Sequence, residues 1–189
     1  MEDKLSHTES LKIINEMIAQ AKNNFDKSGS FYFLLWGWVV MVANLGHYLL
    51  VRFTSYEYPF AVWLLTIPAA LVAAWYGVRQ KNKASVKTHF SGLYGDIWIG
   101  VGICIVLSLV FMPKINFNHG AIIMMLAGIG TFMSGRMLKF QPLVVGAIAL
   151  WIASVVCFNL PETDQYLVGA IGILAGYIIP GYLLKSAEQ

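Results

Sequence analysis

The sequence predicts an all-α integral membrane protein with six transmembrane helices arranged as three helical hairpins, preceded by an N-terminal amphipathic helix. Three observations predict this class. Of the 189 residues, 58% are hydrophobic and 12% are charged, whereas a soluble domain has about 45–50% apolar and about 25% charged residues. The apolar residues fall in six blocks, each long enough to cross the hydrocarbon core of a bilayer. The basic residues gather in alternate loops, as they do in membrane proteins of defined orientation.

The first 29 residues are expected to form a cytoplasmic amphipathic helix. Ser6 and Glu9 have the spacing of a capping box, which satisfies backbone N–H groups at a helix start. Apolar residues then recur three and four positions apart, as on one face of a helix. These residues are Leu11, Ile14, Ile18, Ala21 and Phe25. We expect this face to lie on the inner membrane surface or against the bundle; the alternative is a helix that binds a partner or a second copy.

Residues 30–189 are expected to form the six-helix bundle. The first span, residues 31–51, contains no charged residue. The other spans are predicted at residues 59–78, 94–112, 120–138, 142–158 and 166–184. Pro59 and Pro142 open helices, where a missing N–H costs least. Pro68 and Pro180 lie inside spans and are expected to kink them.

Small residues recur every fourth position in the second, fourth and sixth spans, which lets helix backbones approach closely. The predicted packing positions are Ala69, Ala73, Gly77, Ala127, Thr131, Gly135, Gly172 and Gly176. Near the end of each of these spans, a glycine is followed four residues later by a lysine. The pairs are Gly77 with Lys81, Gly135 with Lys139, and Gly181 with Lys185. This similarity favours a threefold repeat of hairpins.

The positions of the basic residues predict the orientation. Lys and Arg in short loops are retained on the cytoplasmic side. All of the 13 Lys and Arg residues except Arg52 and Lys114 fall on one side of the predicted bundle. Both termini are therefore expected to be cytoplasmic, which requires an even number of spans. The first apolar block is too long for a cleavable signal peptide, and we expect it to act as its own insertion signal.

Asp96 is the only acidic residue inside a predicted span. Ionisable residues at membrane depth are expensive, so each one is a functional candidate until a structural partner is found. Arg136, at the inner end of the fourth span, is the predicted partner. We interpret the two as an ion pair that fixes packing; the alternative is a coupling or proton-relay role.

A second polar group is predicted on the outer side. Asn44 and His47 lie one helical turn apart in the first span, and His119 begins the fourth span on the same side. The nearby carboxylates in sequence are Glu57, Glu162 and Asp164. Two histidines with a carboxylate would make a zinc or proton site. The spacing matches no metal motif, so hydrogen-bonded interfacial histidines are the preferred interpretation.

The sequence lacks GxSxG, HExxH, Walker A and paired CxxC motifs. We therefore expect no catalytic residue, no metal, no cofactor and no enzymatic activity. The basic loop at residues 79–89 lacks interleaved aromatics, which argues against nucleic acid as a partner. The expected partners are the lipid bilayer, a second copy of the chain or another membrane protein.

The predicted function is that of a non-enzymatic membrane module, which acts through helix association with itself, a membrane partner or lipid. The alternative is a channel or carrier for a small solute, with its path through the bundle or along an oligomer axis. A carrier of ions would normally show more buried polar ligands than this sequence provides.

The segment LKIINEMIAQAKNNF at residues 11–25 is followed by FYFLLWGW at residues 31–38. This pattern resembles small bacterial multi-pass inner-membrane proteins that begin with a polar helix and a Trp-Gly first span. The resemblance covers the N-terminal segment and the first span only. It implies a location in the bacterial inner membrane, and it implies no activity.

Overall fold

The computed structural model describes residues 29–83 and 89–188. The predicted N-terminal amphipathic helix lies outside these residues, apart from Gly29, which already belongs to the first span. The described residues form helices and no strand. Within the described ranges, six helices are long and apolar enough to cross a membrane. The predicted all-α class is thereby confirmed for the described residues, and the number of apolar helices of membrane-spanning length agrees with the six predicted spans.

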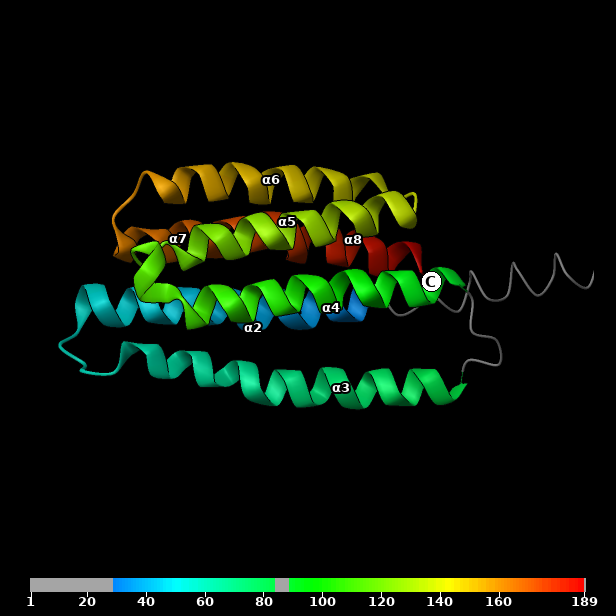
Figure 1. Cartoon of the computed structure of the whole chain (residues 1–189), viewed down its shortest axis with the longest axis horizontal. Coiled ribbons are helices and arrows are strands. Elements are labelled where there is room, and N and C mark those ends of the chain that lie inside the picture. The colour runs from blue at the N-terminus through cyan, green and yellow to red at the C-terminus, as the bar shows by residue number, and fades with distance from the viewer. Residues whose placement is uncertain (1–28, 84–88, 189) are drawn as a thin grey trace, which may run out of the picture.

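The helices run side by side along the long axis of the molecule (Figure 1). The first span is α2 (Gly29–Phe53), and the second joins a 3-10 helix, η1 (Pro59–Leu65), to α3 (Thr66–Lys83). The third is α4 (His89–Val110), which is followed by a short 3-10 helix, η2 (Met112–Ile115). The fourth and fifth are α5 (His119–Met137) and α6 (Gln141–Phe158). The sixth joins α7 (Glu162–Ile173), a π-helical segment η3 (Leu174–Ile178) and α8 (Ile179–Ala187).

Two helices begin four or more residues earlier than the sequence predicts. The helix of the third span begins at His89 and not at residue 94, and that of the sixth span begins at Glu162 and not at residue 166. Glu162 and Asp164 lie in the first turn of α7. Acidic side chains are stabilised there by the helix dipole. The polarity of this segment suggested a loop, but the segment forms the first turn of the helix.

The described chain begins and ends at the same end of the bundle. The Glu188 carboxylate accepts a hydrogen bond from the Ser30 backbone N–H at 3.0 Å and another from the Ser30 hydroxyl. A carboxylate in this place satisfies an unpaired N–H group of the first turn of α2. This arrangement agrees with an even number of spans, while the cytoplasmic location of the ends stays a prediction.

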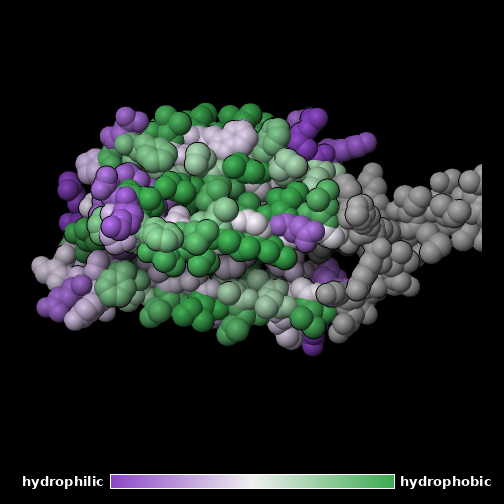
Figure 2. All heavy atoms as spheres, viewed as in Figure 1, coloured by the Kyte–Doolittle hydropathy of each residue, from purple (hydrophilic) through white to green (hydrophobic). Residues whose placement is uncertain are grey.

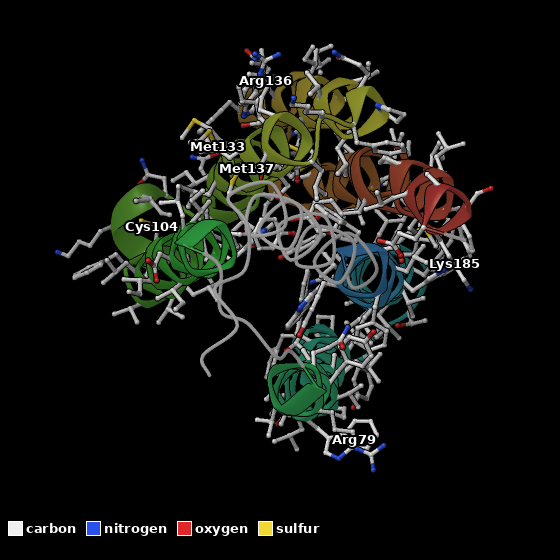
Figure 3. The ribbon with its side chains drawn as sticks, turned by 90° about the vertical axis from the view of Figure 1, so that its right-hand side faces the viewer. Arg79, Cys104, Met133, Arg136, Met137 and Lys185 are labelled. Carbon is white, nitrogen blue, oxygen red and sulfur yellow. The ribbon has the colours of Figure 1, made fainter. Side chains whose placement is uncertain are left out.

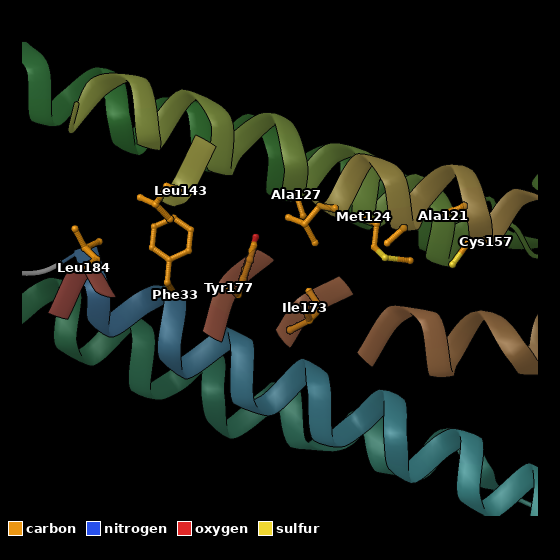
Figure 4. Close-up of a cluster of buried hydrophobic side chains, with 11 residues drawn as sticks. Phe33, Ala121, Met124, Ala127, Leu143, Cys157, Ile173, Tyr177 and Leu184 are labelled. Atoms are coloured by element: carbon orange, nitrogen blue, oxygen red, sulfur yellow. The ribbon is translucent and has the colours of Figure 1, made fainter. Parts of the chain in front are cut away.

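The core lies between α2, α5, α6 and the sixth span (Figure 4). Leu143 and Leu150 of α6 are fully buried, and Phe33 of α2 packs edge-on against Tyr177 of η3. Because lipid tails are as apolar as leucine, burial alone gives little driving force between helices in a membrane. Close packing therefore stabilises this core, through many small dispersion contacts.

Glycine allows the helices of the core to approach one another. A Cβ atom at Gly176 would lie 2.5 Å from Leu150 Cγ, and a Cβ atom at Gly146 would lie 2.8 Å from the Gly176 carbonyl oxygen. At Gly172 it would lie 2.8 Å from Ala153 Cβ. None of these distances leaves room for a side chain. The close contact of α6 with the sixth span therefore requires glycine at these three positions.

The predicted packing positions lie at helix contacts or near them. Ala69, Ala127, Thr131, Gly135, Gly172 and Gly176 are buried, and Ala73 and Gly77 are half-buried. The most extensive helix contacts join α5 with α6 and α2 with α7, which belong to different predicted hairpins. The threefold hairpin repeat stays a prediction.

The two prolines predicted to kink their spans have different surroundings. Pro180 is the second residue of α8, just after the π-helical segment η3, and it has no N–H to donate to the Gly176 carbonyl. The irregular turn therefore lies where a proline interrupts the helix. Pro68 lies in the first turn of α3, where a missing N–H costs little, and the irregular segment of that span is η1, before it.

Helices α3 and α4 lie at the edge of the bundle. Only 6% of the residues in the apolar windows of the second and third spans are buried, against 56% in the sixth. Helix α3 packs mainly on α2, and α4 mainly on α5. Figure 2 shows apolar residues along the helices, with polar residues gathered toward both ends. The outer faces of α3 and α4 therefore meet lipid or another helix in a membrane.

Candidate functional site

His47 is the centre of a polar cluster at the end of the bundle away from Gly29. Its side chain is 8% exposed. The Trp63 indole Nε1–H donates a hydrogen bond to His47 Nδ1 at 3.0 Å. The Tyr166 ring stacks on the imidazole, with the ring centroids 3.9 Å apart and the planes at 17°. Because the three rings come from α2, η1 and α7, this cluster ties three elements together.

Asn44 lies one turn from His47 and is engaged in packing. Its Nδ2 group donates to the Val40 carbonyl at 2.9 Å. Its Oδ1 atom lies against Gly169 of α7, where a Cβ atom would be 2.7 Å away. The amide thus fills the space that a glycine leaves at the contact of α2 with α7.

His119 lies at the start of α5, within electrostatic range of His47. Its Nδ1 atom is 2.9 Å from the Phe117 carbonyl oxygen, a distance at which the protonated nitrogen donates a hydrogen bond. The carboxylates expected nearby from the sequence are Glu57, Glu162 and Asp164. Of these, Glu162 of α7 lies close enough to His119 for the two side chains to interact electrostatically. The structure therefore places the three predicted residues and one carboxylate at one end of the bundle.

The chemistry of this end fits hydrogen-bonded histidines. Among the described residues, no group of three His, Cys, Asp or Glu side chains lies close enough to hold a metal ion. His47 Nδ1 already accepts a bond from Trp63, and His119 Nδ1 faces a carbonyl oxygen. The zinc alternative therefore has no ligand set in the described ranges.

Sequence reasoning did not select Trp63 and Tyr166 as partners of His47. A signal for Trp63 is present in the sequence, because an indole N–H at membrane depth needs an acceptor. An unprotonated histidine in the neighbouring span is such an acceptor. Tyr166 carries no comparable signal, since its contact with His47 is a ring stack between the first and sixth spans.

Asp96 and Arg136 lie on the neighbouring helices α4 and α5, and both side chains are exposed. Within the part of the chain that the structure describes, they form no ion pair with each other. A polar contact between these helices is made by Trp98, whose Nε1–H donates to Ser134 Oγ at 3.2 Å. Figure 3 shows Arg136 projecting outward from the bundle.

The polar side chains inside the bundle are satisfied by the protein itself. Thr131 and Ser134 donate to the carbonyls of Ala127 and Gly130 in their own helix. Ser154 of α6 donates to the Ala121 carbonyl of α5 at 2.7 Å. Over residues 29–83 and 89–188, no buried side-chain nitrogen or oxygen lacks a partner. These groups serve packing, as the bilayer interior requires.

The outer face of α4 has a different character. Among residues 29–83 and 89–188, a Cβ atom at any of its four glycines would meet nothing within 4 Å, whereas every other glycine has a neighbour within that distance. These glycines are Gly92, Gly95, Gly100 and Gly102. Asp96, Ile99 and Cys104 are exposed on the same helix. We call the side of α4 that carries Gly92, Asp96, Ile99 and Gly100 the open face of α4; Cys104, on the same helix, is labelled in Figure 3.

No protein-family model, curated protein or solved structure matches the chain. The geometry of the His47 cluster and of the open face of α4 therefore carries the functional argument.

Replacing Trp63 by phenylalanine removes the indole N–H and leaves His47 Nδ1 without its donor. A buried polar atom left unpaired costs about 1–3 kcal/mol. We expect Trp63→Phe to lower the free energy of unfolding in detergent micelles by about that amount. The matched control is Trp75→Phe, because Trp75 is 55% exposed. The Arg79 guanidinium carbon lies 4.1 Å from the centroid of the Trp75 ring. The expected loss for Trp75→Phe is below about 0.5 kcal/mol, and equal losses would contradict the role of the Trp63 bond.

Proposed function

We propose that the protein is a non-enzymatic polytopic membrane module that acts through helix association, and that its partner is a second copy of the chain. The proposed contact is the open face of α4, together with the outer face of the neighbouring helix α5. The resemblance of the N-terminal region to small bacterial proteins supports the bacterial inner membrane as its location.

The open glycines of α4 carry this proposal. Elsewhere in the chain, glycines lie where a neighbouring group approaches to within 4 Å. A glycine inside a helix costs about 1 kcal/mol relative to alanine. No glycine of the described ranges has a positive φ, so backbone conformation does not require glycine on α4. A helix face with such residues, and without a neighbour in the part of the chain that the structure describes, supports the close approach of another helix.

Charge supports a second copy as the partner. Asp96 and Arg136 are exposed on adjacent helices and do not pair within the chain. In a two-fold symmetric dimer both copies use the same surface, so a contact of one residue with another occurs twice. Asp96 of each copy would face Arg136 of the other. A carboxylate at membrane depth favours such a partner.

The packed interior supports association over transport. The buried hydroxyls of Thr131, Ser134 and Ser154 are bonded to backbone carbonyls. A carrier site presents polar groups or broken helix ends to its substrate, near the middle of the membrane. The described polar side chains buried in this bundle instead form hydrogen bonds to other groups of the protein.

Charge reversal tests the proposed dimer. The measurement is energy transfer between donor-labelled and acceptor-labelled copies in lipid vesicles. Like charges facing each other across an interface cost several kcal/mol, so we expect Asp96→Arg alone and Arg136→Asp alone to weaken association about tenfold or more. The double variant restores the opposite charges, and its association is expected to return close to the wild-type value. Single variants that associate as the wild type does, or a double variant that stays weak, would contradict the proposal.

A further inference from the structure

The hydrogen bond between Trp63 and His47 has only one possible direction. An indole nitrogen can donate but cannot accept, so His47 Nδ1 must be unprotonated and must accept. The proton of the neutral imidazole is then on Nε2. Adding a second proton at Nδ1 would place two N–H groups head to head. The charged form of His47 and this hydrogen bond therefore exclude each other.

The bond joins α2 to η1, a segment that packs on α2 from the surface of the bundle. The 3-10 helix η1 has seven residues, longer than most 3-10 helices, and such stretches often mark hinges. None of its residues is fully buried. Helix α3, which continues from it, packs mainly on α2. Loss of the Trp63 bond would therefore loosen the outer half of the second span from the first.

The surroundings of His47 allow the imidazolium to stay in place after the bond is lost. From α7, the face of the Tyr166 ring lies against the imidazole, and a cation is attracted to such a face. Glu162 of α7 lies within electrostatic range of Tyr166 and of His119. From α5, His119 is the nearby titratable group, and it opposes the charge of His47 when both are protonated. From η1, Trp63 is uncharged.

We propose that His47 and Trp63 form an acid-sensitive latch, which holds η1 against α2 when His47 is neutral and releases it when His47 is protonated. Histidine is the side chain whose charge ordinarily changes between about pH 5 and pH 8. The latch is closed at the upper end of this range and opens as the pH falls. It is independent of whether the chain associates through α4.

The test is the indole N–H resonance of Trp63 in the full-length protein, labelled with ¹⁵N-tryptophan in detergent micelles. Its assignment comes from Trp63→Phe. Between about pH 8 and pH 5, we expect this resonance to move with a single titration step as the bond is lost. Trp98 donates to a serine hydroxyl and Trp151 to a backbone carbonyl, and neither acceptor titrates in this range. The indole resonances of Trp98 and Trp151 are therefore expected to keep the same chemical shift.

Two variants assign the titration to one histidine. His47→Asn keeps an acceptor near the position of Nδ1 and cannot take up a proton, so its Trp63 resonance is expected not to titrate. His119→Gln removes the neighbouring histidine and is expected to keep the titration of the Trp63 resonance. The proposal is overturned if Trp63 does not titrate in the wild type, if it titrates in His47→Asn, or if the three indole resonances move together.

A second test measures whether η1 stays against α2, by the yield of a disulfide bond introduced between them. A Cβ atom at Gly46 would lie 3.7 Å from Val62 Cβ, within the usual range for a disulfide. Gly46→Cys and Val62→Cys are combined with Cys104→Ala and Cys157→Ala, and oxidation yields are compared with and without His47→Asn. The comparison at equal pH cancels the titration of the thiols. We expect equal yields near pH 8 and, near pH 5, a lower yield in the protein that keeps His47. Equal yields at both pH values would overturn the release of η1.

Discussion

Replacing Gly146 by alanine is expected to lower the free energy of unfolding by about 2–3 kcal/mol, at the upper end of the usual cost of overpacking. The added Cβ atom would lie 2.8 Å from the Gly176 carbonyl oxygen and 3.2 Å from its Cα atom. Both are backbone atoms, so no side-chain rotation relieves the clash. Helix α6 and segment η3 must move apart, and the packing around Leu150 is lost along their contact.

The control for this prediction is the same substitution on α4. A Cβ atom at Gly100 meets no described residue within 4 Å, so Gly100→Ala is expected to leave the stability unchanged or to raise it by up to about 1 kcal/mol through helix propensity. Both variants are measured by denaturant unfolding in dilute detergent micelles, where copies are kept apart. Equal destabilisation by the two substitutions would contradict the assignment of Gly146 to a helix contact.

Replacing Gly100 by leucine is expected to weaken self-association by about tenfold or more while leaving the fold of the single chain intact. A Cβ atom at Gly100 meets none of the described residues within 4 Å, so we expect the unfolding free energy to stay near the wild-type value. In a two-fold dimer, each copy brings one leucine to the contact. Two added side chains then hold the helices apart. The measurement is energy transfer between labelled copies in lipid vesicles.

The matched control for association is Val145→Leu on α6. Val145 is 64% exposed, so a larger side chain also has room there. It lies outside the proposed contact, and its association is expected to equal that of the wild type. If Gly100→Leu associates as the wild type does, or if Val145→Leu is weakened equally, the open face of α4 is not the contact.

The number of spans was predictable because it rests on a strong physical signal. A bilayer requires a long uninterrupted apolar segment for each crossing, and six such segments are present. The boundaries were less accurate at polar helix starts. The first turn of α7 contains Glu162 and Asp164, which read as a loop by polarity, although acidic residues are favourable at a helix N-terminus.

The contacts between spans were only partly predictable. Small residues at every fourth position led to Gly172 and Gly176, which do lie at close helix contacts. Hydropathy alone did not show that Gly100, by contrast, has no neighbour within 4 Å among the described residues. The physical reason is that lipid and protein interior are equally apolar, so hydropathy does not distinguish a lipid-facing position from a buried one.

The candidate site required the structure. The residues Asn44, His47 and His119 were selectable because polar groups at membrane depth are rare and costly. The partners of His47 come from spans two and six, so sequence spacing carries no information about them. The expected pairing of Asp96 with Arg136 is not formed within the described chain, where Trp98 and Ser134 make a polar contact between the same two helices.

The most direct measurement of the proposed function is the number of copies in one assembly. Fluorescently labelled wild-type protein, reconstituted in vesicles at increasing ratios of protein to lipid, is counted by single-molecule photobleaching. The proposed dimer predicts two bleaching steps above its dissociation constant, and one step for Gly100→Leu under the same conditions. A single step for the wild type at every ratio would contradict self-association through α4.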